Sequence, residues 1–211
     1  MDRLDQINTF NRLIKVSRET IESLIIYENI LIRANKSLNL VGNSTIKQVW
    51  TRHFLDSAQV IDFIDKNDKI ILDLGSGAGF PGLVIAILAK DRKIPLNVKL
   101  IEKSSKKIKF LNEIINKLKL NAEALDQDIS SRQIKFSNDL FVSRAFKPLN
   151  ITLELIHNKA QNWKKIFIFL GKTGEQQLIL ASNNWDIKYK QRMSITSKDS
   201  KIIEINKLIK K

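Results

Sequence analysis

A cluster of glycines follows an apolar run in the first half of this sequence. Four of the seven glycines of the 211-residue chain, Gly75, Gly77, Gly79 and Gly82, lie within eight positions of one another. Glycine adopts positive φ angles without strain and leaves the backbone amides uncovered, so a small ligand can lie directly against the main chain. Because one glycine would suffice for a tight strand-to-helix turn, we interpret this segment as a ligand-binding loop.

The loop is compatible with two kinds of cofactor. Gly77, Gly79 and Gly82 satisfy the pattern G-x-G-x-x-G of dinucleotide-binding loops. Pro81 interrupts that pattern where the first N–H groups of the helix would hold a pyrophosphate. The frame DLGSGAG, which begins at Asp73, instead resembles the first motif of class I methyltransferases that use S-adenosylmethionine. In those enzymes the loop packs beside the amino-acid part of the cofactor, which carries no phosphate.

An acidic residue and a polar segment follow two further predicted strands. Glu102 closes the apolar run NVKLIE, where a carboxylate can accept hydrogen bonds from both hydroxyls of a ribose. The segment QDISS, residues 127–131, follows the third predicted strand, where a methyltransferase would hold the adenine edge. Ligands of a doubly wound sheet bind outside the carboxyl ends of its strands, so both features are expected to lie beside the glycine loop.

The composition excludes several kinds of active site. The chain has no cysteine, and its two histidines, His53 and His157, are too few for a histidine-rich metal site. We therefore predict no thiolate nucleophile and no metal. No apolar run approaches the roughly 18 residues of a membrane span, and the first residues lack the apolar core of a signal peptide. We expect a cytoplasmic protein without a membrane partner.

The charge of the chain is strongly positive. Lysine and arginine number 36 against 22 aspartate and glutamate, which gives a net charge of +14 and an isoelectric point near 9.9. Such an imbalance attracts polyanions and favours nucleic acid as a partner. One basic group at the start of a predicted helix either contacts RNA phosphates or forms a solvated helix face; it comprises Lys103, Lys106, Lys107 and Lys109.

Apolar periodicity divides the chain into a helical and an alternating part. Helical spacing over residues 17–36, with Ser17 as N-cap, and again after Ser44 predicts a helical N-terminal cap over residues 1–65. Over residues 66–211 predicted strands alternate with helices, and two consecutive strands close the chain. This pattern predicts an α/β fold with a Rossmann-like, mostly parallel sheet covered on both faces and an antiparallel edge strand.

Several segments together resemble one family, the bacterial 16S rRNA (guanine-N7) methyltransferases, also called glucose-inhibited division protein B. The glycine motif alone indicates only the superfamily, whereas RHFLDS before it and SRAF after it are more specific. The matching segments, in the family's order and spacing, are NLVGN (39–43), TRHFLDS (51–57), DLGSGAGFPGL (73–83), IEKSSKKIKFL (101–111) and VSRAFKPL (142–149).

The resemblance implies a fold, an activity and a set of site residues. The fold is that of class I S-adenosylmethionine-dependent methyltransferases. The activity is methylation of guanine N7 in the 530 loop of 16S rRNA, at guanine 527, so that the partner is 16S rRNA or the small ribosomal subunit. Nothing requires an oligomer, and we expect a monomer. With the loop and strand-end arguments above, the residues expected to bind the cofactor are Gly75, Gly77, Phe80, Glu102, Ile129, Ser130 and Arg144.

The chain departs from the family pattern at two places. The family usually has an acid at the position of Ser130, so the contact here is expected to run through the backbone. The family favours LKG after the fifth strand, whereas this chain has Leu170 in place of that lysine and Lys172 further on, whose role stays open. Arg52 and His53 are expected to hydrogen-bond the cap onto the α/β domain rather than to act on the cofactor.

The chemistry that the resemblance implies needs few protein groups. N7 of guanine carries a free lone pair at neutral pH, so its attack on a sulfonium methyl group requires no general base. We therefore expect a site that supplies proximity, in-line geometry and a dry pocket. The alternatives are a methyltransferase for another RNA base or a small molecule, an NAD-dependent oxidoreductase, and a non-catalytic RNA-binding factor. The intact loop, Glu102 and Arg144 argue against the last.

Overall fold

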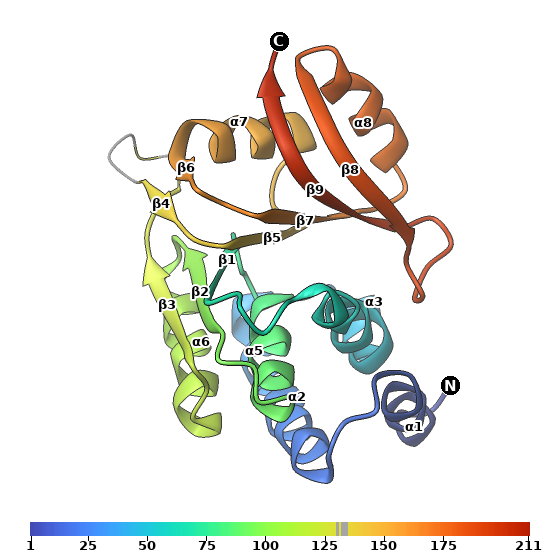
Figure 1. The fold of residues 1–211 in the computed structure, drawn as a ribbon. Coiled ribbons are helices and arrows are strands. Elements are labelled where there is room, and N and C mark those ends of the chain that lie inside the picture. The colour runs from blue at the N-terminus through green and yellow to red at the C-terminus, as the bar shows by residue number, and fades with distance from the viewer. Residues whose placement is uncertain (130, 132–134) are drawn as a thin grey trace.

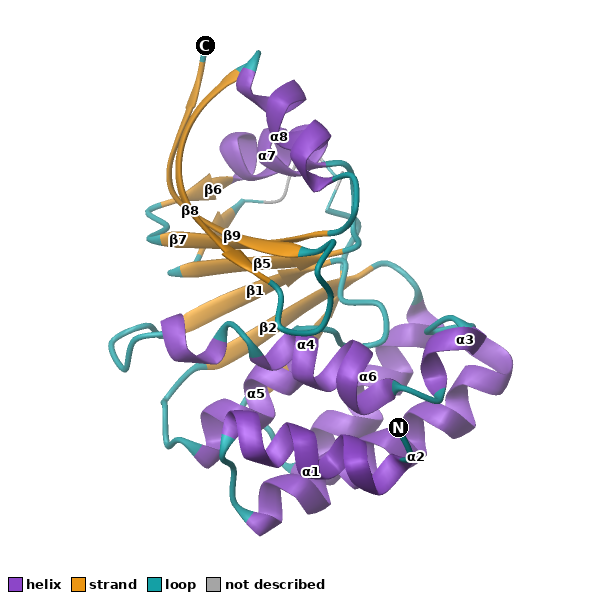
Figure 2. Cartoon of the chain, turned by 90° about the vertical axis from the view of Figure 1, so that its right-hand side faces the viewer, coloured by secondary structure: helices purple, strands orange, loops and turns teal. Residues whose placement is uncertain are grey.

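A seven-stranded sheet lies between two layers of helices in the computed structural model, which describes residues 1–129, 131 and 135–211 (Figure 1). Figure 2 shows the sheet nearly edge-on, with α7 and α8 on one side and the remaining long helices on the other. The strands are β1 (Ile70–Leu74), β2 (Asn97–Glu102), β3 (Ala122–Asp126), β4 (Phe136–Ser137), β5 (Leu140–Arg144), β6 (Ala160–Gln161), β7 (Lys165–Leu170), β8 (Trp185–Met193) and β9 (Lys201–Lys210). The helices are α1 (Arg3–Ile14), α2 (Arg18–Leu38), α3 (Asn43–Ile46), the π-helical turn η1 (Trp50–Leu55), α4 (Asp56–Ala58), the 3₁₀ turn η2 (Ile61–Phe63), α5 (Gly82–Asp91), α6 (Ser105–Leu118), α7 (Leu149–Lys159) and α8 (Gly174–Ser182).

The strand order places a crevice at the centre of the sheet. The order is β3-β2-β1-β5-β7-β9-β8. The first five strands in this order are parallel, and β9 pairs antiparallel with both β7 and β8. The predicted parallel sheet with an antiparallel edge is therefore confirmed. Because the chain builds outward from β1 in both directions, the switch point lies between β1 and β5, where open α/β sheets bind their ligands. A short parallel pair of β4 and β6 was not predicted.

The predicted strand-to-helix unit around the glycines forms for local reasons. The strand β1 is apolar except for Asp73 and is buried on both faces, as expected for the centre of a parallel sheet. The following helix, α5, is buried from Gly82 to Ala89 and lies against the sheet, which matches its uniformly apolar sequence. Between them, the loop is held at the carboxyl edge of the sheet.

The N-terminal segment is helical, with two differences from the prediction. Ser17 caps α2 by accepting a hydrogen bond from the Thr20 amide, as predicted. An additional helix, α1, precedes it. The helix expected after Ser44 is present as three short pieces, α3, η1 and α4. The π-helical turn η1 buries Trp50 and His53, and turns of this type are frequent at functional sites.

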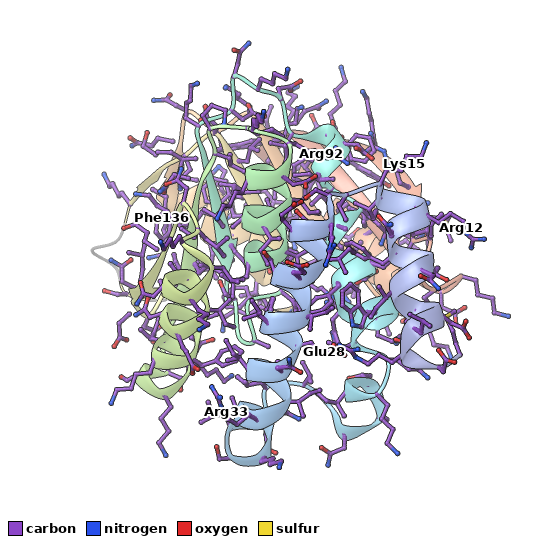
Figure 3. All side chains as sticks on the ribbon, turned by 90° about the horizontal axis from the view of Figure 1, so that it is seen from below. Arg12, Lys15, Glu28, Arg33, Arg92 and Phe136 are labelled. Carbon is purple, nitrogen blue, oxygen red and sulfur yellow. The ribbon has the colours of Figure 1, made fainter. Side chains whose placement is uncertain are left out.

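The N-terminal helices share one hydrophobic core with one face of the sheet. Phe10 and Leu24 belong to the same buried cluster as Leu83 of α5 and Leu111 of α6. Figure 3 looks onto this layer and labels Glu28 of α2, whose buried carboxylate pairs with the Arg3 guanidinium of α1 (Figure 3). The division at residue 65 stays a prediction. Among the helices of the described residues, none has both the length and the apolarity needed to cross a membrane.

Candidate functional site

A cavity of about 490 Å³ opens at the carboxyl ends of β1, β2 and β5. Six of the seven residues predicted to bind a cofactor lie in its wall: Gly75, Gly77, Phe80, Glu102, Ile129 and Arg144. The seventh, Ser130, lies outside the described residues. The fold therefore brings together four sequence segments that are separated by up to 69 positions, from Gly75 to Arg144.

The glycines of the loop serve two different purposes. A Cβ atom on Gly75 would lie 2.2 Å from the Phe146 ring, and one on Gly79 would lie 2.7 Å from the Tyr27 hydroxyl, so these glycines admit neighbouring side chains of the protein itself. Gly77 has φ of 56°, and a Cβ there would meet only a carbonyl oxygen at 3.8 Å. Since Gly77 also lies in the cavity wall, it is the position of the loop at which bare backbone is open to a ligand.

Asp73 fixes the start of helix α5. Its side chain is completely buried, and its Oδ2 accepts a hydrogen bond of 2.9 Å from the Gly82 amide. A Cβ atom on Gly82 would lie 2.7 Å from this oxygen, which explains the fourth glycine. Burial raises the pKa of Asp73 to about 7, against the opposing effect of the Gly82 hydrogen bond. The carboxyl group thus takes the helix N-terminus that a dinucleotide pyrophosphate would need.

Glu102 ties the end of β2 to the glycine loop. One carboxylate oxygen, Oε2, accepts a hydrogen bond of 3.1 Å from the Gly77 amide. The other, Oε1, accepts hydrogen bonds from the amides of Lys103 and Ser104 at 3.0 and 2.9 Å. Each carboxylate oxygen has two acceptor sites, so the backbone uses both sites of Oε1 and one of Oε2, and Oε2 keeps one site for a hydroxyl of a ligand.

An aromatic stack supports the wall behind the loop. The Phe80 ring lies between Tyr27 of α2, at 5.5 Å, and His53 of η1, at 4.9 Å. The Tyr27 hydroxyl donates a hydrogen bond to the carbonyl of Ala78 within the loop. Phe80 is only 6% exposed, because both of its faces are covered by these rings. The N-terminal helices therefore contact the loop directly and set its shape.

Arg144 joins β5 to the N-terminal helices. Its Nε lies 3.1 Å from Asp56 Oδ2, and its Nη2 donates hydrogen bonds to the Arg52 carbonyl at 2.8 Å and to His53 Nδ1 at 3.3 Å. Asp56 in turn accepts hydrogen bonds from the hydroxyls of Ser194 and Thr196, between β8 and β9. Most donors of the Arg144 guanidinium are thus used within the protein.

His53 is held in a neutral form. Because arginine can only donate, His53 Nδ1 accepts from Arg144, which leaves the proton on Nε2 for the hydrogen bond of 3.0 Å with the Thr45 hydroxyl. Burial, assisted by the positive charges of Arg144 and Arg52, lowers the pKa of His53 to about 3. Neither ring nitrogen of His53 is therefore available to accept a proton at neutral pH.

The basic residues near the cavity lie at its rim. Lys103, Lys107 and Lys147 belong to the cavity wall. Lys172 does not line the cavity, and Leu170, which occupies the place of the family's lysine, is buried in the core. Three lysines at the mouth of the cavity produce a positive potential where a polyanionic substrate would approach.

Sequence reasoning missed several residues of the site. Tyr27 occupies an ordinary apolar position of a helix, so nothing local distinguishes its contact with the loop. Asp56 and Phe146 lie in two of the recognised segments, RHFLDS and SRAF, but received no role. Leu40 and Val41 also line the cavity, and the signal for them was the segment NLVGN.

The residues of the cavity fit S-adenosylmethionine better than a dinucleotide. The cofactor carries a sulfonium and an ammonium group, and the carboxylate of Glu102 lies in the cavity wall. The Gly82 amide at the start of α5, which a pyrophosphate would need as a free donor, already donates its hydrogen bond to Asp73 Oδ2. The donor set of the loop therefore disfavours the oxidoreductase alternative.

The amino-acid sequence matches one protein family over most of its length. The model of the family described as rRNA small subunit methyltransferase G matches residues 20–206. The ribosomal RNA small subunit methyltransferase G of Pelagibacter ubique is 38% identical over 198 residues, which cover 93% of this chain and 92% of that protein. The protein of the same name from Rickettsia akari is 35% identical over 196 residues, covering 93% and 98%.

Solved structures resemble the fold at low sequence identity. A SAM-dependent methyltransferase from Aquifex aeolicus superposes with a TM-score of 0.57 at 18% identity, covering 83% of this chain and 98% of that one. M. capricolum TrmK, solved in complex with S-adenosyl-homocysteine, superposes with a TM-score of 0.53 at 18% identity, covering 72% and 67%. The likeness confirms the predicted class I methyltransferase fold.

Proposed function

The chain belongs to the rRNA small subunit methyltransferase G family, and we propose that it methylates N7 of guanine 527 in the 530 loop of 16S rRNA. As a member of this family it is an S-adenosylmethionine-dependent rRNA methyltransferase. The observation that carries the proposal is the family match over residues 20–206, which includes every described residue of the cavity wall. The predicted enzyme class is therefore confirmed, and the position of the modified guanine is the proposed part.

The chain's own residues would hold the cofactor against the loop. When bound, S-adenosylmethionine supplies an electrophilic methyl group on sulfur. We propose that Gly77 leaves room for its amino-acid part and that Oε2 of Glu102 accepts a hydrogen bond from a ribose hydroxyl. Ile129 and the backbone near Ser130 would flank the adenine. Holding both reactants in an enclosed site contributes several kcal/mol through effective molarity.

No side chain is needed to remove a proton. N7 of guanine attacks with its own lone pair, and His53 has both ring nitrogens engaged in hydrogen bonds. The low pKa of His53, about 3, keeps the ring neutral and prevents it from repelling a cationic cofactor. His53 therefore supports Phe80 and Arg144 and does not transfer protons.

Replacing His53 by glutamine is expected to leave the single-turnover rate of methyl transfer within about tenfold of the native rate, because loss of general acid–base catalysis costs more than that. The amide of glutamine can still accept from Arg144 and donate to Thr45. His157→Gln, at an exposed histidine of α7, serves as the matched control. A thousandfold loss in His53→Gln, with an unchanged circular dichroism spectrum, would show that the ring acts in the chemistry.

The positive charge would attract the RNA substrate. With a net charge of +14 and three lysines at the mouth of the cavity, we expect RNA binding to weaken steeply as salt is raised. The 16S rRNA or the small subunit as partner, a monomeric enzyme and a cytoplasmic location are parts of this proposal. Recognition would depend on RNA shape, because the sequence contains no aromatic-rich RNA-binding motif.

The proposal is tested with tritiated S-adenosylmethionine and 16S rRNA from cells that lack the enzyme. Labelled RNA is cleaved chemically at 7-methylguanosine, and one cut in the 530 loop is expected. RNA that already carries the modification is the control and should take up no label. Label at another position would show that the enzyme modifies a different guanine. Label found only with assembled small subunits would show that the subunit, and not free 16S rRNA, is the substrate.

A ligand comparison separates the oxidoreductase alternative. S-adenosylmethionine is expected to raise the melting temperature of the protein, because a ligand that binds only the folded state stabilises it. NAD at the same concentration should produce no shift. The reverse result would reject the proposed cofactor.

A further inference from the structure

Phe146 is an aromatic side chain at the mouth of the cavity that no step above uses. It follows β5 two residues after Arg144, is partly exposed, and belongs to the cavity wall. Its ring lies directly on the backbone of Gly75, where any Cβ atom would collide with it. Ala145, immediately before it, has φ of 51°, a left-handed conformation that an alanine adopts only when its surroundings enforce it. The chain thus turns sharply at the end of β5 and presents Phe146 at the cavity.

The other aromatic rings of the wall are already covered. Phe80 is sandwiched between Tyr27 and His53, and it is 6% exposed. His53 is covered on one face by Phe80 and is 9% exposed. Among the described residues of the wall, Phe146 is therefore the aromatic side chain with surface left for a planar ligand.

The Phe146 ring already attracts a cation. The ammonium group of Lys147 lies 5.5 Å from its centroid, within the range of cation–π attraction. Lys147 is exposed, so its side chain can leave the ring at little cost and move toward an RNA phosphate. The ring would then be free for a base, next to a positive charge that binds the backbone of the same nucleotide.

The chemistry of the reaction makes an aromatic surface useful at this place. A base that is methylated must be unstacked from its neighbours, and enzymes hold such bases between aromatic or apolar side chains. When N7 attacks, a bond forms between N7 and the methyl carbon, the carbon–sulfur bond breaks, and its electron pair stays on sulfur. No proton moves, and the positive charge passes from sulfur to the purine. A ring stacked on the purine therefore attracts it more strongly as the charge develops.

We propose that Phe146 is the surface on which the target guanine stacks during methyl transfer. This inference rests on the proposed function and adds the residue that contacts the purine. It also assigns a second purpose to Gly75, which lets the ring lie low enough to bring the base beside the cofactor loop.

The first test compares Phe146→Leu, Phe146→Trp and the native enzyme on the same 16S rRNA. Loss of a base–aromatic stack corresponds to about 10- to 100-fold, so the single-turnover rate of Phe146→Leu is expected to fall by that factor. The affinity for S-adenosylmethionine should stay within about twofold, because leucine keeps the apolar contact with Gly75. Phe146→Trp should restore the native rate. Phe136→Leu, at a half-buried phenylalanine of β4 outside the cavity (labelled in Figure 3), is the matched control.

The second test does not depend on activity. In Phe146→Trp, the added indole is expected to lose fluorescence when 7-methylguanosine monophosphate is titrated in, in excess of any change in the native protein with its three tryptophans. Unmethylated guanosine monophosphate should quench less, because it lacks the positive charge.

The outcomes separate this inference from the function on which it rests. If the native enzyme fails to label guanine 527, the proposed function is wrong, and the fluorescence titration alone decides the stacking role: equal quenching of Phe146→Trp and the native protein would reject it. If the native enzyme labels it and Phe146→Leu is equally fast, the stacking role is rejected. If Phe146→Leu instead loses affinity for S-adenosylmethionine, the ring only supports the loop at Gly75, and the inference is rejected as well.

Discussion

The free energy of unfolding of the native protein is expected to fall by about 4 kcal/mol, relative to that of the variant Asp73→Asn, as the pH is raised from 4 to 8. Burial raises the pKa of Asp73 from 3.8 to about 7. Between these two values the folded state binds a proton that the unfolded state has lost, so native stability falls as the pH rises through this window. This increase in the pKa from 3.8 to about 7 corresponds to about 4 kcal/mol of stability.

Asparagine does not titrate, so the variant should lack this slope while its carbonyl oxygen still accepts from the Gly82 amide. The difference between the two proteins is measured by urea denaturation at several pH values, which cancels any constant cost of the amide group. Asp126→Asn, at an exposed carboxylate at the end of β3, is the matched control for the removal of one carboxylate. If the free energy of unfolding varies with pH in the same way in Asp73→Asn and in the native protein, the pKa of Asp73 is not raised.

The variant Arg144→Met is expected to lower the free energy of unfolding by about 3 kcal/mol. The ion pair between Arg144 and Asp56 is largely shielded, with side chains 19% and 13% exposed. Removing one partner of a buried pair leaves an uncompensated charge, which costs about 3–5 kcal/mol. Methionine keeps the length of the side chain, so the loss reports the charge and the hydrogen bonds to Arg52 and His53.

The double variant Asp56→Asn/Arg144→Met should recover most of this loss. Asparagine removes the unpaired charge and retains the oxygen that accepts from Ser194 and Thr196. Arg92→Met, which breaks a more exposed pair with Asp62, should cost less than about 1 kcal/mol. The pKa of His53 should rise in Arg144→Met, because one positive neighbour is gone, and this is visible by NMR titration. Equal losses in the single and double variants would reject the ion pair as the cause.

Local patterns in the sequence were enough to predict the α/β part of the fold. From residue 70 onward, segments with the apolar spacing of strands alternate with segments that have the apolar spacing of helices. Each element buries its apolar face against its neighbours. The glycine loop, Glu102 and the segment SRAF were recognised because their residues are consecutive. The three helical pieces after Ser44 could not be predicted, since a π-helical turn and a regular helix have similar apolar spacing.

The contacts that shape the site join residues far apart in the sequence. Tyr27 reaches Ala78, and Arg144 reaches Asp56, because α2 and η1 pack onto the same face of the sheet as α5. No local pattern encodes such pairs, so the sequence predicted the glycine loop as a binding loop and missed that Gly75 and Gly79 mainly admit Phe146 and Tyr27. The apolar periods of the sequence were sufficient for the alternation of strands and helices from residue 70 onward, its motifs were sufficient for the family, and the cofactor loop stays a prediction. Burial depends on packing between segments that are far apart in the sequence, and it raises the pKa of Asp73 and lowers that of His53. The same packing places Phe146 at the mouth of the cavity.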